Sequence, residues 1–135
     1  MFKTDIKIRF NHVDLAGLVF YPRYFEMFNQ VVEEWFEGPL GHDFKRLHEE
    51  LNAGVPAVHI DADFLSPSRL GDVLTYSLEV KKVGRSSIEL AIEAVCNNEV
   101  RLKGHLTLVY IVRTSPGKVI SSPIPANIKK LMLET

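Results

Sequence analysis

A carboxylate lies shortly before a predicted helix start in this chain. Asp14 precedes Tyr21 by seven residues, and Pro22 suits the first helical position because its missing N–H would have no partner there. The first backbone N–H groups of a helix carry partial positive charge and can hold a developing oxyanion. Asp14 could attack a carbonyl polarised in this way, or deprotonate a water that attacks it. The spacing therefore indicates ester or thioester hydrolysis.

The amides available for this chemistry are few. Pro22 has no N–H, so the candidates near the helix start are Tyr21, Arg23 and Tyr24. A lone aspartate that follows a strand is also a common turn former. The residue types alone therefore leave Asp14 open to a structural role as well as a catalytic one.

Composition narrows the class of protein. The 135 residues are 46% hydrophobic and 24% charged, which predicts one globular domain over residues 1–135. A net charge of −1 without a long basic run argues against a nucleic-acid partner. Cys96 is the only cysteine, which excludes a disulfide scaffold and favours a reducing cytoplasm. No segment is apolar for long enough to predict a membrane span.

Hydrophobic periodicity predicts the elements that must position the carboxylate. Alternation of apolar and polar residues predicts strands at residues 2–10, 57–65, 73–83, 87–97 and 100–112. Helical spacing predicts a long helix with a wide aromatic stripe at residues 22–36 and a shorter helix at residues 42–51. The side chains expected to face inward from the first two strands include Phe10, Val58, Ile60, Ala62 and Phe64.

The order of these elements predicts the fold class. Short connections near residues 84–85 and 97–98 favour antiparallel hairpins. A strand, a long apolar helix, a short helix and then several long strands indicate an α+β protein with one antiparallel sheet and its helices on one face. A sheet that curls around the long helix would bury its wide apolar stripe.

The stretch RFNHVDLAGLVFYPRYF, residues 9–25, resembles the signature of hotdog-fold acyl-CoA thioesterases of the 4-hydroxybenzoyl-CoA thioesterase type. That signature is an acidic residue, two residues, a glycine, two apolar residues, an aromatic, Tyr-Pro and a further aromatic. The matching positions here are Asp14, Gly17, Leu18-Val19, Phe20, Tyr21-Pro22 and Tyr24. The similarity extends to GVPAVHIDADFLSPSRLGDVLTY (54–76) and VGRSSIEL (83–90), and so to most of the chain.

The resemblance implies a hotdog fold, in which an antiparallel sheet of five to six strands wraps around one long central helix. It implies that Asp14 is the nucleophile or general base and that the Tyr21 backbone N–H polarises the thioester carbonyl. Gly17 and Tyr24 would contact the substrate. Hotdog domains pair as homodimers with sites at the interface, and often form homotetramers, so a lone chain is expected to be inactive. Coenzyme A enters only as part of the substrate, and no separate cofactor is expected.

Two details bear on the site and its substrate. His12 occupies a position where relatives often carry another acidic residue, and it could hydrogen-bond the site or cap the turn. Tyr21-Pro22 is similar to the aromatic acyl-CoA type, whereas the short-chain branch often has Tyr-His. This favours an aromatic acyl group such as 4-hydroxybenzoyl. A second hotdog group uses a glutamate on the central helix, but Glu26, Glu33 and Glu34 are expected on its solvated side.

Cations and hydroxyls at one hairpin are candidates for holding the phosphates of coenzyme A. Lys81, Lys82 and Arg85 cluster there beside Ser86 and Ser87. In similar proteins this hairpin contacts coenzyme A, so the resemblance implies Arg85, Ser86 and Ser87 as binding residues.

The remaining histidines show no ligand spacing on a shared element, so no metal site is predicted; they are His42, His48, His59 and His105.

Two other functions stay open at this stage. A hotdog dehydratase would use a histidine with an acidic partner, for which His12 and Asp14 lie close in sequence, and would produce an enoyl thioester. A non-catalytic acyl-CoA binding domain would bind tightly without turnover. The sequence also leaves open the acyl group, the choice between coenzyme A and acyl carrier protein, the arrangement of a tetramer, and whether Asp14 attacks directly.

Overall fold

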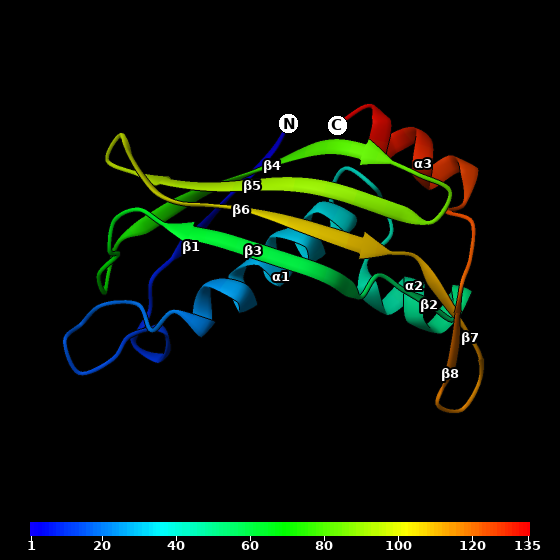
Figure 1. Ribbon diagram of the computed structural model, residues 1–135, viewed down its shortest axis with the longest axis horizontal. Helices are drawn as coiled ribbons and strands as arrows, with labels where there is room; N and C mark the ends of the chain where they lie inside the picture. The colour runs from blue at the N-terminus through cyan, green and yellow to red at the C-terminus, as the bar shows by residue number, and fades with distance from the viewer.

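A five-stranded antiparallel sheet is the main layer of the computed structural model, which describes residues 1–135 (Figure 1). Its strands are β1 (Phe2–Lys7), β3 (Ala57–Phe64), β4 (Val73–Val83), β5 (Ser87–Cys96) and β6 (Glu99–Val109). They lie in the order β1-β4-β5-β6-β3, and every neighbouring pair is antiparallel. Asn97 and Asn98 both have positive φ, which suits the tight hairpin between β5 and β6.

Helix α1 (Pro22–Glu37) lies behind this sheet in Figure 1 and buries its aromatic side against it. Its buried residues are Tyr24, Met27, Phe28, Val31, Val32, Trp35 and Phe36. Two shorter helices follow, α2 (Phe44–Leu51) and α3 (Ala126–Leu133). The Asp43 side chain caps α2 by accepting the Arg46 N–H, so this helix begins two residues later than predicted. No helix is long and apolar enough to cross a membrane.

A glycine on β6 lets α1 approach the sheet. A Cβ atom at Gly104 would lie 2.9 Å from Cε2 of Phe28 and would clash with the carbonyl oxygen of Asp61. Any side chain there would push the helix or the neighbouring strand away. Gly104 therefore allows the ring of Phe28 to pack directly on the strands.

A second, smaller sheet was not predicted. It contains β2 (Ala53–Gly54), β7 (Ile111–Ser115) and β8 (Lys118–Ser121) in the order β2-β7-β8. The single strand expected at residues 100–112 is therefore two strands that part at Tyr110. The Tyr110 N–H donates to the Ser86 carbonyl and its carbonyl accepts the Ser122 N–H, so the chain changes partners at this residue.

Two expectations about inward-facing side chains are wrong for the single chain. Val58, Ile60 and Phe64 are 64%, 39% and 48% exposed, because β3 is an edge strand with β6 as its one neighbour. Phe10 is 82% exposed, because β1 ends at Lys7 and the short 3₁₀ turn η1 (Phe10–His12) turns the chain outward.

Candidate functional site

Asp14 lies in a tight turn that closes on itself. Its N–H donates to the Leu18 carbonyl at 2.9 Å, and its own carbonyl accepts the Gly17 N–H at 3.0 Å. Its Oδ1 accepts the Ala16 N–H at 2.9 Å, whereas its Oδ2 has no hydrogen-bond partner. Gly17 has φ of +75°, a backbone conformation that favours glycine. Asp14 is thus a turn former that still has one carboxylate oxygen available for chemistry.

The Tyr21 amide at the start of α1 is free. Tyr21 directly precedes Pro22, and its N–H donates to no acceptor within the chain. The N–H groups of Arg23 and Tyr24 instead donate to the carbonyls of Phe20 and Tyr21 at 2.9 and 3.1 Å. Of the three amides that the sequence offers near this helix start, only Tyr21 can polarise the carbonyl of a ligand.

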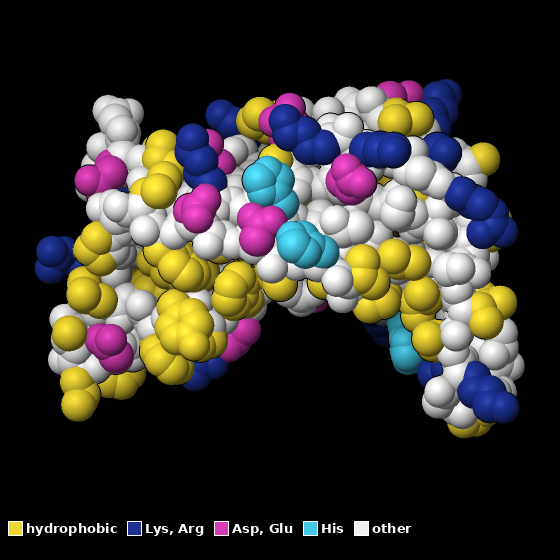
Figure 2. Space-filling view, in the orientation of Figure 1, with side chains coloured by type: hydrophobic (Ala, Val, Ile, Leu, Met, Phe, Trp, Pro, Cys, Tyr) yellow, Lys and Arg dark blue, Asp and Glu magenta, His cyan; other side chains and the backbone are white.

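Asp14 and Tyr21 line the same depression, of about 370 Å³. The other lining residues are Leu18, Val19, Tyr24, Phe64, Leu65, Ser66 and Pro67. The ring of Tyr24 is stacked on that of Phe64, with centroids 5.5 Å apart, and Tyr21 meets Phe64 edge-on at 6.3 Å. The depression is therefore lined by an acidic residue, by the residue that has the free amide, and by aromatic rings. Figure 2 shows hydrophobic side chains gathered over this end of the molecule.

The end of β3 is the part of this wall that sequence reasoning missed. Phe64 was expected in the core, yet it borders the depression together with Ser66 and Pro67. An indirect signal was available, because residues 54–76 share the family resemblance that residues 9–25 show. That resemblance does not say which of these side chains reach the carboxylate.

His12 lies outside this depression. Its Nδ1 accepts the Arg9 N–H at 2.8 Å, and its carbonyl accepts the Phe20 N–H at 2.9 Å. Burial lowers the pKa of His12, and the nearby Arg23 and Arg9 add to this effect while Glu26 opposes it. The geometry therefore gives His12 the turn-capping role, one of the two roles that the sequence left open.

Arg85, Ser86 and Ser87 lie at the other end of the main sheet. Arg85 and Ser86 connect β4 to β5 and Ser87 begins β5, whereas the Asp14 turn lies beside Arg69, just before β4 begins (Figure 1). Strand β4 has 11 residues, so its ends are on the order of 30 Å apart. The Arg85 side chain is exposed and makes no hydrogen bond or ion pair. A single chain does not bring this hairpin and Asp14 together.

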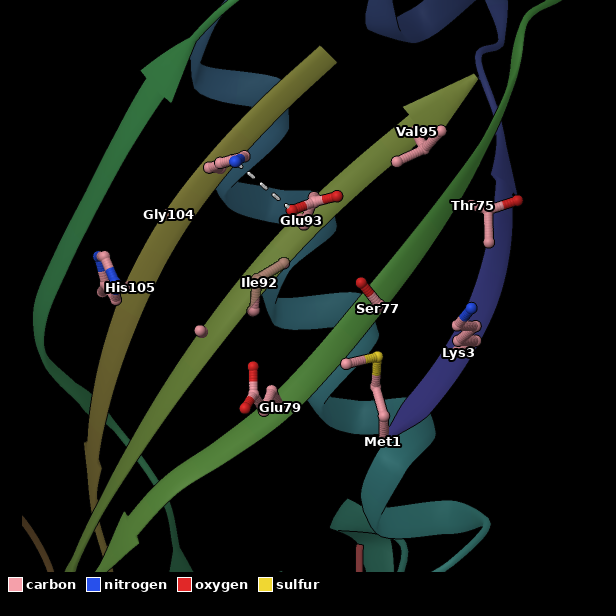
Figure 3. A pocket seen from close by; sticks show the side chains of 12 residues that line it. Met1, Lys3, Thr75, Ser77, Glu79, Ile92, Glu93, Val95, Gly104 and His105 are labelled. Atoms are coloured by element: carbon pink, nitrogen blue, oxygen red, sulfur yellow. Dashed lines mark ion pairs between the residues drawn. The ribbon is translucent and has the colours of Figure 1, made fainter. Parts of the chain in front are cut away.

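The sheet face opposite α1 carries a second hollow, of about 550 Å³ (Figure 3). Charged side chains of both signs stand on it, including Lys3, Glu79 and Glu93, and they come from separate strands. The ion pair within it joins Glu93 to Lys103 at 3.9 Å. No carboxylate faces a free helix amide here, so this face lacks the combination that Asp14 and Tyr21 provide.

Two histidines share one carboxylate on the same face. His59 Nε2 and His105 Nδ1 lie 2.9 and 3.0 Å from the two oxygens of Asp61. Hydrogen bonds from His59 and then His105 lower the pKa of Asp61. Sequence spacing does not reveal this cluster, because His105 is on β6 and only the strand register places it opposite Asp61.

The family model described as the thioesterase superfamily matches residues 16–103, well over half of the chain. The chain belongs to the thioesterase superfamily. Its curated relatives include 1,4-dihydroxy-2-naphthoyl-CoA hydrolases. The one from Nostoc punctiforme is 29% identical over 117 residues, covering 87% of this thioesterase and 78% of the relative. The one from Acaryochloris marina is 28% identical over 83 residues, covering 62% and 60%.

Solved structures share the fold of this thioesterase. The 4-hydroxybenzoyl-CoA thioesterase from Pseudomonas sp. strain CBS-3 superposes with a TM-score of 0.87 at 20% identity, covering 96% of this chain and 97% of that one. The 1,4-dihydroxy-2-naphthoyl-CoA thioesterase from Synechocystis gives 0.86 at 18% identity, covering 98% and 96%. The predictions of an α+β hotdog-like thioesterase fold and of a thioester hydrolase are confirmed. The residues that match the family model begin at Ala16, so the match does not include Asp14.

Acid is expected to weaken the turn that His12 caps. An unfolded histidine titrates near pH 6.5, and the pKa of folded His12 is lower. The unfolded chain therefore binds more protons as the pH falls through about 6.5, so the stabilisation by neutral His12 is present above this pH and is lost below it. In urea denaturation, the free energy of unfolding should fall more for the wild type than for His12→Gln between about pH 7 and pH 5.

The comparison with His12→Gln isolates His12, because every other titrating group is common to both proteins. Glutamine can still accept the Arg9 N–H but carries no titrating group in this range. Parallel curves of unfolding free energy against pH for the two proteins would contradict the assignment.

Proposed function

We propose that this thioesterase hydrolyses an acyl-CoA thioester to the free acid and coenzyme A, with Asp14 as nucleophile or general base and the Tyr21 N–H as the group that polarises the carbonyl. The observation that carries this proposal is that Asp14 and Tyr21, whose N–H donates to no acceptor within the chain, line the same depression. Membership of the thioesterase superfamily supports the reaction class.

The proposed mechanism places the thioester carbonyl oxygen on the Tyr21 N–H. The positive end of α1 then stabilises the negative charge that develops on this oxygen as the carbonyl carbon is attacked. In one route Oδ2 of Asp14 attacks the carbon and the coenzyme A thiolate leaves, after which water hydrolyses the mixed anhydride. In the other route Asp14 removes a proton from a water that attacks the same carbon. Both routes give the acid and the thiol.

An aromatic acyl group is the substrate we infer. The wall beside Asp14 and Tyr21 contains the rings of Tyr24 and Phe64, and flat rings favour stacked or edge-on neighbours. The curated relatives are hydrolases of 1,4-dihydroxy-2-naphthoyl-CoA, and a structural neighbour acts on 4-hydroxybenzoyl-CoA. Both acyl groups are hydroxylated aromatic rings.

A homodimer is the smallest active unit in this proposal. Strand β3 has one free edge and exposes Val58 and Ile60, features of a surface that pairs with another chain. The Arg85 hairpin lies too far from Asp14 in its own chain, so a partner could supply it to bind coenzyme A. A homotetramer would combine two such dimers.

The unpaired, buried Cys96 supports a reducing compartment, and we place the protein in the cytoplasm.

Asp14→Asn should reduce hydrolysis by at least about 10²-fold, because the amide can neither attack the carbonyl nor accept a proton from water. Asparagine can still accept the Ala16 N–H, so the turn should persist. Release of the coenzyme A thiol, followed with a colorimetric thiol reagent, measures the rate. Circular dichroism and thermal unfolding show whether the variant is folded.

The matched control is Asp5→Asn, which makes the same change at an aspartate on β1 outside the depression. It should retain wild-type activity. Full activity in folded Asp14→Asn would refute the proposed site. Formation of an enoyl thioester by the wild type would instead indicate a dehydratase, and tight acyl-CoA binding without turnover would indicate a binding domain.

Aromatic thioesters should be the best substrates. We expect kcat/KM for 1,4-dihydroxy-2-naphthoyl-CoA or 4-hydroxybenzoyl-CoA to exceed that for acetyl-CoA and octanoyl-CoA by about twofold to tenfold, since an aromatic pair is worth roughly 0.5–1.5 kcal/mol beyond area burial. The same thiol-release assay compares all four. Equal or higher kcat/KM for octanoyl-CoA would contradict the aromatic assignment while leaving Asp14 unaffected.

Val58→Glu should break the proposed dimer, because it places a charge on the free edge of β3. The wild type should scatter light as two or four times the 15.3 kDa chain mass, and the variant should have a lower mass and lose hydrolysis. Leu133→Glu is the control, since Leu133 on α3 is equally exposed at 64%. A wild-type protein that is monomeric and active would exclude the dimer requirement.

A further inference from the structure

Arg101 is the one charged residue that is buried in this chain, with 8% of its surface exposed. It lies at a β-bulge, since Ala94 pairs with Leu102 and Val95 pairs with Val100, which leaves Arg101 without a partner on β5. Arg101 and Leu102 are consequently both buried although they are adjacent in the strand. The bulge redirects the Arg101 side chain to the inside of the protein.

The Arg101 guanidinium holds the loop between β3 and β4. Its Nη1 donates to the Pro67 carbonyl at 3.2 Å, to the Ser68 hydroxyl at 3.1 Å and to Oδ2 of Asp72 at 2.8 Å. Its Nε lies 2.7 Å from Oε1 of Glu99 without hydrogen-bond geometry, so this contact is an ionic attraction. A buried cation needs such partners, and they fix the loop around it.

That loop in turn holds the Asp14 turn. The Val19 N–H donates to the Ser68 carbonyl at 3.0 Å, and the Leu70 N–H donates to the Gly17 carbonyl at 3.1 Å. No other hydrogen bond joins residues 13–19 to anything outside residues 9–20. The position of the Asp14 carboxylate therefore depends on the loop that Arg101 binds.

The two halves of this loop are anchored differently. At its end, the Asp72 carbonyl accepts the Ile8 N–H at 2.7 Å and the Gly71 N–H donates to the Ile8 carbonyl at 2.9 Å, so Ile8, the residue after β1, holds that half without the Arg101 side chain. The first half contains Pro67 and Ser68, which Arg101 binds directly. Loss of the guanidinium should therefore loosen the half that supports Val19 while the loop stays attached to the sheet.

We propose that Arg101 is a positioning residue of the thioesterase site, which acts through residues 66–72 to keep the Asp14 carboxylate in register with the Tyr21 N–H. This inference rests on the proposed function of Asp14. Arg101 itself does not line the depression, although Ser66 and Pro67 of the loop that it holds do. Arg101 affects where the Asp14 carboxylate lies, so its loss should change substrate affinity little.

Arg101→Met tests this proposal, because methionine keeps much of the side-chain volume and removes the donors and the charge. We expect kcat on 4-hydroxybenzoyl-CoA to fall about 10- to 100-fold, since a misplacement near 1 Å can cost 10²-fold, while KM changes less than about threefold. Arg101→Lys keeps the charge and should recover part of kcat. Lys103→Met is the control, because it removes a cation from an exposed position on the same strand and should leave kcat unchanged.

A double-mutant cycle separates positioning from general destabilisation. If Arg101 acts through Asp14, adding Arg101→Met to Asp14→Asn should lower kcat no further. Hydrogen exchange of the wild type and Arg101→Met should show faster exchange at the Val19 and Leu70 amides, with the central strands still protected. Additive losses in the cycle, or unchanged exchange at these two amides, would overturn the proposal.

Ser68→Ala covers the case in which Arg101→Met does not fold. It removes one acceptor of the guanidinium and leaves the ion pair with Asp72, and it should lower kcat about threefold to tenfold, again without additivity to Asp14→Asn. Wild-type kcat in folded Arg101→Met or Ser68→Ala, beside an inactive Asp14→Asn, would refute the positioning role alone. An active Asp14→Asn would refute the proposed function itself.

Discussion

The burial of the aromatic side of α1 against the main sheet is the interaction on which the rest of this structure depends. Trp35, Phe36 and Phe28 have no exposed surface, and burial of a large apolar side chain is worth about 1.5–3 kcal/mol. Gly104 allows this contact to be close. The packing fixes the helix as a rigid element, and with it the position and direction of the amide at its start.

The two groups proposed to react with the substrate, the Tyr21 N–H and the Asp14 carboxylate, lie near the start of α1, at the edge of this packed region. Pro22 begins α1 without an N–H, and the 3₁₀-like bonds of Arg23 and Tyr24 leave the Tyr21 amide as the free donor. The carboxylate comes from a separate turn with only two hydrogen bonds to the rest of the protein. The placement of the Tyr21 N–H relative to the Asp14 carboxylate therefore depends on two parts of the protein. One is the rigid helix α1, and the other is the loop that the buried Arg101 holds.

The candidate residues for coenzyme A show why one chain is an incomplete description of the proposed enzyme. Arg85 and Asp14 are near opposite ends of β4, and the edge strand β3 carries apolar side chains with no cover. Alternation of apolar and polar residues assigned those side chains to a core because it shows which face of a strand is apolar. It does not show whether that face packs against the same chain or against a second copy of the chain.

Local patterns in the chain were enough to predict most elements and to identify the central residues. Local periodicity predicted α1 and strands β4 and β5 to within a residue or two, and the Asp14 to Tyr21-Pro22 motif identified the family and its reaction class. The folded chain was needed to show which amide is free, how Arg101 reaches residues 66–72, and that His59 and His105 meet at Asp61. These features depend on strand register, on a bulge and on contacts between residues far apart in the chain, and spacing along a sequence carries no direct record of them.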